Sequence, residues 1–159
     1  MIVTVRLQRE DFDTAAEIAA LTRGRTDVGA VATFTGVCRA DNEGQRIEAM
    51  TLEHYPGMAE AEIARHVEEA KKRWPLLGVT VIHRYGRLVP GDNVVLVVTT
   101  TSHREAAFAA AEFLMDYLKT RAPFWKKEER ADGTAWVSAR HTDDAAAERW
   151  EGRRREAAE

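Results

Sequence analysis

The sequence predicts one α+β domain with a mixed, mainly antiparallel sheet. Apolar runs typical of strands occur in neighbouring pairs, and amphipathic helical segments separate these pairs. No glycine-rich loop of the nucleotide-binding type occurs, which argues against a doubly wound parallel sheet. The 159 residues are enough for one domain with a substantial core and too few for two.

Periodicity defines the elements of the first half of the chain. They are a strand at 2–7, a helix capped by Asp11 or Asp13 and ending at Leu21, a strand at 29–39, a polar loop at 40–45, a strand at 47–55 and a helix at 58–74. Gly36 indicates a bulge or a close backbone approach within its strand. Since only a short loop separates strands 29–39 and 47–55, we expect them to form a hairpin. The helix places Ile63, Val67 and Ala70 on one apolar stripe.

The region from Val94 to Glu128 is the centre of the second half. A strand at 79–85 and a turn at 90–92 precede it. The unbroken apolar run 94–98, extended by three threonines, is typical of a strand covered on both faces. Ser102 and Glu105 match a capping box, which would place His103 and Arg104 in the first turn of a helix. Pro123 predicts that this helix ends near Arg121.

The C-terminal part is rich in charge. We expect a basic, aromatic loop around Trp125, a turn at Asp132 and Gly133, and a short strand at 135–138. The tail is rich in Ala, Glu and Arg, so it either forms a helix or frays. We therefore divide the chain into a single domain at 1–142 and a charged tail at 143–159.

Charge and cysteine content exclude several classes of function. The formal net charge of −3 argues against bulk attraction to nucleic acid or to an anionic membrane. The single cysteine, Cys38, allows no intrachain disulfide, and we expect it to be a small buried residue. The five histidines are scattered, so no metal site is predicted. No signal-peptide pattern and no membrane-length apolar run occur, which predicts a cytoplasmic setting.

Two groups of cations indicate a site for a small anion. His103 and Arg104 lie at a predicted helix start, where free N–H groups and the helix dipole attract anions. Phe108, Met115 and Lys119 share one helical stripe, so Lys119 ends an otherwise apolar face. A lysine there ordinarily just complements the helix C-terminus. The cations of the following loop favour a functional interpretation.

The two groups lie too far apart for one small ligand. Sixteen residues separate His103 from Lys119, which is about 24 Å of helix at roughly 1.5 Å per residue. If both belong to one site, they must come from two copies of the chain. The spacing therefore predicts a homodimer with a shared site.

Several short motifs, in one order, resemble the large, catalytic subunit of molybdopterin synthase, the MoaE family. The resemblance covers roughly residues 29–140. The motifs are Phe34-Thr35-Gly36 with Arg39, Glu53-His54-Tyr55 with Met58-Ala59, His83-Arg84-Tyr85-Gly86, Ser102-His103-Arg104, Lys119, Pro123-Phe124-Trp125-Lys126-Lys127-Glu128, and Asp132-Gly133 before Trp136-Val137. Each motif alone would be weak evidence, and together they make coincidence improbable.

The resemblance implies an α/β hammerhead fold and a homodimer in which each subunit binds a small ubiquitin-like sulfur carrier. The carrier ends in Gly-Gly with a terminal thiocarboxylate. Two sulfur transfers would convert cyclic pyranopterin monophosphate into the dithiolene of molybdopterin, with no resident cofactor or metal.

The resemblance also implies the roles of particular residues by matching position. Lys119 and Lys126 would be the catalytic lysines. The residues that bind substrate or line the pocket would be Arg39, His103, Arg104, Lys127, Glu128, Phe34 and Met115. Because clustered cations disfavour one another's protonation, a lysine here can exchange a proton near neutral pH. General acid, general base, electrostatic clamp and nucleophile remain alternatives for Lys119, and Arg140 is either a further pocket residue or simply solvated.

Two other functions are compatible with the same residues. A non-catalytic scaffold could use the cations only to hold a partner's carboxylate tail. A binder of single-stranded nucleic acid could use Phe124, Trp125 and the lysines for stacking and charge. The negative net charge and the short basic run argue against the second alternative.

Overall fold

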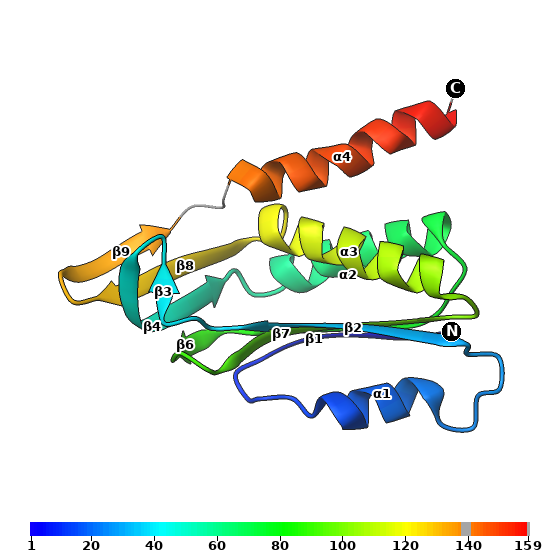
Figure 1. Ribbon diagram of the computed structural model, residues 1–159, viewed down its shortest axis with the longest axis horizontal. Coiled ribbons are helices and arrows are strands. Elements are labelled where there is room, and N and C mark those ends of the chain that lie inside the picture. The colour runs from blue at the N-terminus through cyan, green and yellow to red at the C-terminus, as the bar shows by residue number, and fades with distance from the viewer. Residues whose placement is uncertain (138–140, 159) are drawn as a thin grey trace.

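The computed structural model describes residues 1–137 and 141–158, with side chains described in 1–137 and 144–152 (Figure 1). It confirms the α+β class. The elements in chain order are β1 (Ile2–Gln8), α1 (Thr14–Thr22), β2 (Ala30–Val37), β3 (Asp41–Asn42), β4 (Gln45–His54), α2 (Met58–Arg73), β5 (Leu76–Arg84), β6 (Gly86–Leu88), β7 (Asn93–Thr101), α3 (Arg104–Thr120), β8 (Phe124–Arg130), β9 (Gly133–Val137) and α4 (His141–Ala158).

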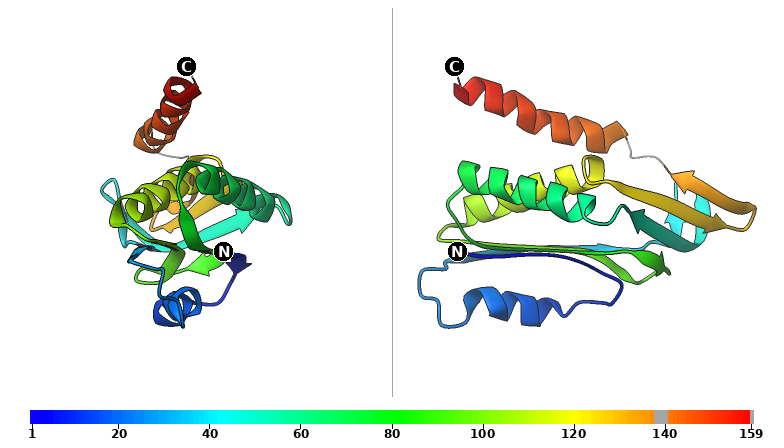
Figure 2. Two further views of the ribbon diagram at one scale, coloured as in Figure 1. Left: turned by 90° about the vertical axis from the view of Figure 1, so that its right-hand side faces the viewer. Right: turned by 180° about the vertical axis from the view of Figure 1, so that it is seen from behind.

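The first sheet has the strand order β1-β5-β7-β2, with α2 and α3 on one face and α1 on the other (Figures 1 and 2). Strands β1 and β5 are parallel, and the other pairs are antiparallel. Along β7, Val95 and Val97 belong to the core under α2 and α3, whereas Leu96 and Val98 pack with residues of α1. The prediction of a strand covered on both faces is therefore confirmed.

The second sheet has the order β3-β4-β8-β9, and β6 pairs with β4. The predicted hairpin between strands 29–39 and 47–55 is wrong, because β2 pairs with β7 whereas β4 pairs with β8. The predicted bulge at Gly36 is confirmed by a register shift after this residue.

The predicted polar loop at 40–45 folds as the hairpin of β3 and β4. Its two turn residues, Glu43 and Gly44, have φ of 53° and 80°, the left-handed conformation that such tight turns need.

The start of α3 differs from the expected capping box. The N-cap is His103, without a side-chain cap hydrogen bond. The Ser102 hydroxyl instead donates to the carbonyl of Asp27 at 3.3 Å, and Thr101 Oγ1 donates to the His103 carbonyl at 2.6 Å. A Cβ on Gly29 would lie 2.2 Å from the Ser102 carbonyl oxygen. This close approach ties the chain before β2 to the loop before α3, so Ser102 is not available as a cap.

The expected basic loop after Pro123 is strand β8. It forms because residues 124–130 pair with β4 on one side and with β9 on the other. The predicted end of α3 near Arg121 is confirmed, since this residue is the C-cap. The N-cap of α1 is Asp13, one of the two predicted caps, and its side chain accepts from the Ala16 N–H.

Helix α4 lies along α3 (Figure 1). Trp150 is buried in edge-to-face contacts with Trp74 and Phe113, and its indole N–H donates to Asp116 at 2.6 Å. The described part of the tail is thus helical and shares the core of the first sheet. The division at residue 142 stays a prediction, and Arg140 lies outside the described residues.

Both ends of the described chain lie on the same side of the molecule. Strand β1 starts, and α4 finishes, at the end opposite the β8–β9 hairpin (Figures 1 and 2).

Among the described residues, none of the helices combines the length and apolar character needed to cross a membrane.

Candidate functional site

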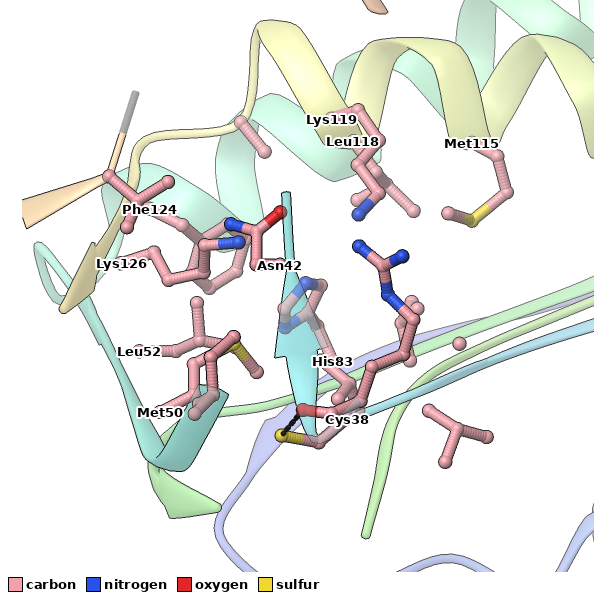
Figure 3. Close-up of a pocket in the computed structure, with 18 of the residues that line it drawn as sticks. Cys38, Asn42, Met50, Leu52, His83, Met115, Leu118, Lys119, Phe124 and Lys126 are labelled. Atoms are coloured by element: carbon pink, nitrogen blue, oxygen red, sulfur yellow. Dashed lines mark hydrogen bonds between the residues drawn. The ribbon is translucent and has the colours of Figure 1, made fainter. Parts of the chain in front are cut away.

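A cavity of about 870 Å³ lies where the two sheets meet the C-terminal end of α3 (Figure 3). Its wall contains four basic side chains from three segments of the chain: Arg39 before β3, Lys119 in α3, and Lys126 and Arg130 in β8. Apolar groups from β2, β4 and α3 form much of the remaining surface, including Phe34, Met50, Leu52, Met115 and Leu118. A cavity of this kind suits a ligand with a negative charge and an apolar or aromatic body.

Helix α3 contributes Met115 and Lys119, one helical turn apart. Figure 3 shows the Lys119 side chain directed into the cavity. The third member of the predicted stripe, Phe108, is 65% exposed and lies at the other end of the helix. The apolar stripe that Lys119 ends is therefore buried at Met115 but exposed at Phe108. Only the C-terminal turns of this stripe face the second sheet.

Strand β8 sends alternate side chains to opposite faces. Lys126 lines the cavity, and Figure 3 shows its ammonium group directed toward the space that Lys119 also faces. The next residue, Lys127, points to the other face, where its Nζ lies 4.4 Å from the centre of the Trp136 ring. The expectation that Lys127 lines the same pocket is corrected by this alternation.

Glu128 lies beneath the cavity wall and is fully buried. Its carboxylate accepts hydrogen bonds from Asn42 Nδ2, at 3.1 and 3.2 Å to the two oxygens, and from Arg130 Nη2 at 3.0 Å. Burial opposes ionisation, but the bonds from Asn42 and Arg130 outweigh it and hold the pKa of Glu128 below its ordinary value. The structure thus places Glu128 behind the wall formed by its two partners, rather than at the cavity surface.

Asn42 and Arg130 were missed from the sequence. Asn42 lies in the segment interpreted as a loop, where nothing in the pattern distinguishes it. Arg130 shares a strand face with Lys126, since the two are four residues apart, and assigning β8 correctly would have revealed this.

A neutral histidine completes the aromatic side of the cavity. His83 stacks on Phe124 at 4.1 Å between ring centres, and its Nδ1 lies 2.8 Å from the Arg84 carbonyl oxygen. Burial lowers the pKa of His83 to about 4, with smaller effects from Lys119 and His54 in the same direction. Because the neutral ring must donate from Nδ1 to that carbonyl, Nε2 is the unprotonated nitrogen.

His103 and Arg104 lie elsewhere. With Glu105 and Phe108 they line a shallow depression at the N-terminal end of α3. The structure does not bring them to Lys119, in agreement with the predicted spacing along the helix.

Cys38 lines the cavity but is only 6% exposed. Its Sγ lies 3.8 Å from the carbonyl oxygen of Arg39, a weak contact that Figure 3 shows as a dashed line. Burial raises the pKa of the Cys38 thiol, which makes it a poor nucleophile. This geometry agrees with the prediction of a small buried residue.

The fold and the cavity define a class: an α+β protein with a cationic pocket for a small anion between two sheets. The chain belongs to the MoaE protein family, whose model matches residues 7–121. It is 65% identical over 149 residues to the molybdopterin synthase catalytic subunit of Mesorhizobium japonicum, covering 92% of each chain.

Two solved structures are also similar. The Burkholderia ambifaria molybdopterin biosynthesis MoaE protein has 51% identity and a TM-score of 0.80, and the match covers 94% of this chain and 99% of that one. Molybdopterin synthase from Staphylococcus aureus has 32% identity and a TM-score of 0.76, with 83% of this chain and 95% of that one covered.

Proposed function

We propose that this protein is the catalytic subunit of a molybdopterin synthase. It transfers sulfur from the C-terminal thiocarboxylate of a small ubiquitin-like carrier to cyclic pyranopterin monophosphate, and so makes the dithiolene of molybdopterin. The observation that supports this most directly is the cavity that joins Arg39, Lys119 and Lys126 to an apolar wall, in a chain of the MoaE family.

The charges of the cavity suit both reactants. A thiocarboxylate tail and a cyclic phosphate are anions, and opening the phosphate ring and releasing a carboxylate both develop charge on oxygen. Cations fixed in a partly enclosed site stabilise such charge more than they stabilise the neutral parts of the ground state. We assign Arg39 to anion binding, Lys119 and Lys126 to catalysis, and Phe34 and Met115 to the apolar wall that faces the pterin.

The site is completed, in this proposal, by a second copy of the chain. His103 and Arg104 remain candidates for anion binding, but within one chain they line a different depression from Lys119. A homodimer in which the N-terminal end of α3 of one copy approaches the cavity of the other would unite them. The carrier's Gly-Gly tail would enter the cavity from outside this dimer.

Mixed dimers test the shared site. An Arg104→Ala chain and a Lys119→Ala chain should each be inactive as homodimers. Their heterodimer should regain about half of the parent activity, because one of its two sites keeps both residues. Verified heterodimers without activity would contradict the shared site.

Turnover tests the proposed reaction itself. The purified protein, a thiocarboxylated carrier and cyclic pyranopterin monophosphate should yield molybdopterin, detected as its fluorescent oxidation product. Lys119→Ala should lower the rate by about 100-fold or more, the range observed when one stabilising group is removed from an active site. Lys72→Ala, on the exposed face of α2, is the matched control.

Failure would have a specific meaning. Tight carrier binding without product would favour the scaffold alternative, in which the cavity only holds a carboxylate tail. We further propose that residues 1–142 form the catalytic domain, that residues 143–159 are a charged tail that packs on this domain through Trp150, and that the protein works in the cytoplasm.

A further inference from the structure

The hairpin of β3 and β4 forms one rim of the cavity. Asp41, Asn42, Glu43 and Gln45 all contribute to the lining. The hairpin begins two residues after Arg39, so its position influences where this cation lies. The contacts that hold the hairpin in place therefore affect the shape of the site.

The backbone bonds of the hairpin are few. Strand β3 has two residues, and its register pairs are Asp41 with Arg46 and Asn42 with Gln45. The Ile47 N–H also donates to the Ala40 carbonyl at 2.8 Å. Strand β4 continues to His54 and pairs with β6 and β8, so the marginally stable part of the hairpin is β3 with its turn. Contacts to the rest of the molecule must add to its stability.

The contact from β3 to strand β8 is a hydrogen bond to a buried charge. Asn42 Nδ2 lies 3.1 and 3.2 Å from the two carboxylate oxygens of Glu128, which is fully buried. Eighty-six residues separate these partners in the sequence. A buried carboxylate needs donors, and removing one of them costs more than an exposed bond would. Arg130 supplies the other donor from β8 itself.

We propose that Asn42 is a positioning residue that latches the β3–β4 hairpin to Glu128 and so keeps Arg39 and the cavity rim in place for the anionic substrate. Glu128 then acts through Asn42 and Arg130, without contacting substrate. The kinetic part of this inference rests on the proposed function, whereas the structural part does not.

The first test measures single substitutions at the two positions, which the next variant then combines. Asn42→Ala should raise KM for cyclic pyranopterin monophosphate about tenfold, the equivalent of one hydrogen bond to a charge, and should change kcat less than threefold. Asn42→Asp should have a larger effect, because it places a second carboxylate against Glu128. Glu128→Gln should also be impaired, since its amide N–H₂ would face a donor.

The double variant Asn42→Asp with Glu128→Gln restores a donor opposite an acceptor, because the amide N–H₂ at position 128 faces the carboxylate at position 42 and the single amide oxygen at position 128 stays available to accept from Arg130. Its KM should return to within about threefold of the parent, a rescue measured by the double-mutant cycle. A merely structural role of each residue alone would make the two losses add. A double variant no better than Asn42→Asp, although folded, would overturn the latch.

Hydrogen exchange tests the latch independently of the reaction. In Asn42→Ala, the amides of residues 45–47 should exchange at least tenfold faster, while those of β5 and β7 should not change. Arg46→Ala, exposed on the same hairpin, is the control. Unchanged exchange at 45–47 would overturn the proposal. If the parent itself shows no turnover, the proposed function fails and the exchange result still decides the latch.

Discussion

Strands β7 and β8 are both paired on two sides, but β7 is apolar and buried whereas β8 is mostly charged and partly exposed. Each lies between two strands of its sheet. The side chains of residues 95–101 in β7 are all buried, and they are apolar or threonine. In β8, FWKKEER, Glu128 alone among the strand's residues is buried to that degree. Backbone pairing is therefore not what distinguishes a framework strand from a site strand. Apolar burial fixes β7, whereas in β8 hydrogen bonds from Asn42 and Arg87 hold the carboxylates of Glu128 and Glu129.

This contrast predicts different consequences for substitutions in the two regions. Changes around β7 should act on the free energy of unfolding and leave the chemistry of the folded protein intact. Changes on the cavity face of β8 should act on turnover and leave unfolding nearly unaffected.

The largest effect is expected in the core between the first sheet and helices α2, α3 and α4. Phe113 is fully buried and touches Trp74, Tyr117 and Trp150 edge to face. Phe113→Ala should lower the free energy of unfolding by about 3–5 kcal/mol, because it leaves a cavity in a packed core. Urea denaturation measures this loss. A cost below about 1 kcal/mol would mean that α3 and α4 are not packed as described.

The next effect separates the two faces of β8. Lys126→Ala should lower turnover by about 100-fold, or about 2.7 kcal/mol of transition-state stabilisation, because it removes a cavity cation. Lys127→Ala, whose ammonium lies over Trp136, should change turnover less than about threefold. Steady-state kinetics of the two variants makes the comparison. Equal losses would show that alternation along β8 does not define the site.

A smaller effect concerns pH. The pKa of His83 is about 4 in the folded protein, against an ordinary value near 6.5, because burial disfavours its charged form. The unfolded chain therefore binds more protons between these values. Stability is complete above pH 6.5 and is lost as the pH falls toward 4. Between pH 7.5 and 5 this single group should account for about 2 kcal/mol.

Urea midpoints at the two pH values check this contribution. His83→Asn, which keeps a side-chain donor for the Arg84 carbonyl, should reduce the difference between the two pH values. The pKa of His66 is also lowered to about 4 by burial, so a slope from that residue should remain. An unchanged difference in His83→Asn would mean that the pKa of His83 in the folded protein is close to its ordinary value.

The smallest effect is expected at Cys38. Cys38→Ser should keep turnover within about twofold, because in the proposed reaction the sulfur arrives on the carrier and the thiol is buried with a raised pKa. The same turnover assay measures it. Abolished turnover in a folded variant would make Cys38 a sulfur carrier.

The first sheet could be predicted from the sequence to a large extent. The apolar run of β7, the stripe of α2 and the proline after α3 are local signals, and each gives the right element. The second sheet could not be predicted in the same way. Strand β8 has no apolar periodicity, and its partners in β4 lie at least 70 residues earlier.

In the candidate site, too, contacts between segments far apart in the sequence could not be predicted. The family resemblance supplied Arg39, Lys119 and Lys126, and the structure brings them to one cavity. The pairing of Asn42 with Glu128 left no trace in the sequence, because it depends on two segments that meet only through tertiary structure. The separation of His103 from Lys119 could be predicted, since helix length alone determines it.

The placement of the chain ends has a practical consequence. The start of β1 and the last turn of α4 lie at the end of the molecule opposite the β8–β9 hairpin (Figure 1). A purification tag, a fluorescent dye or a linker to a biosensor surface attached to either of them would be far from the cavity of the same copy, but at the end of α3 that approaches the second copy in the proposed dimer. Carrier binding to immobilised protein therefore tests the shared site as well, because a bulky attachment at this end should hinder a second copy more than it hinders the carrier.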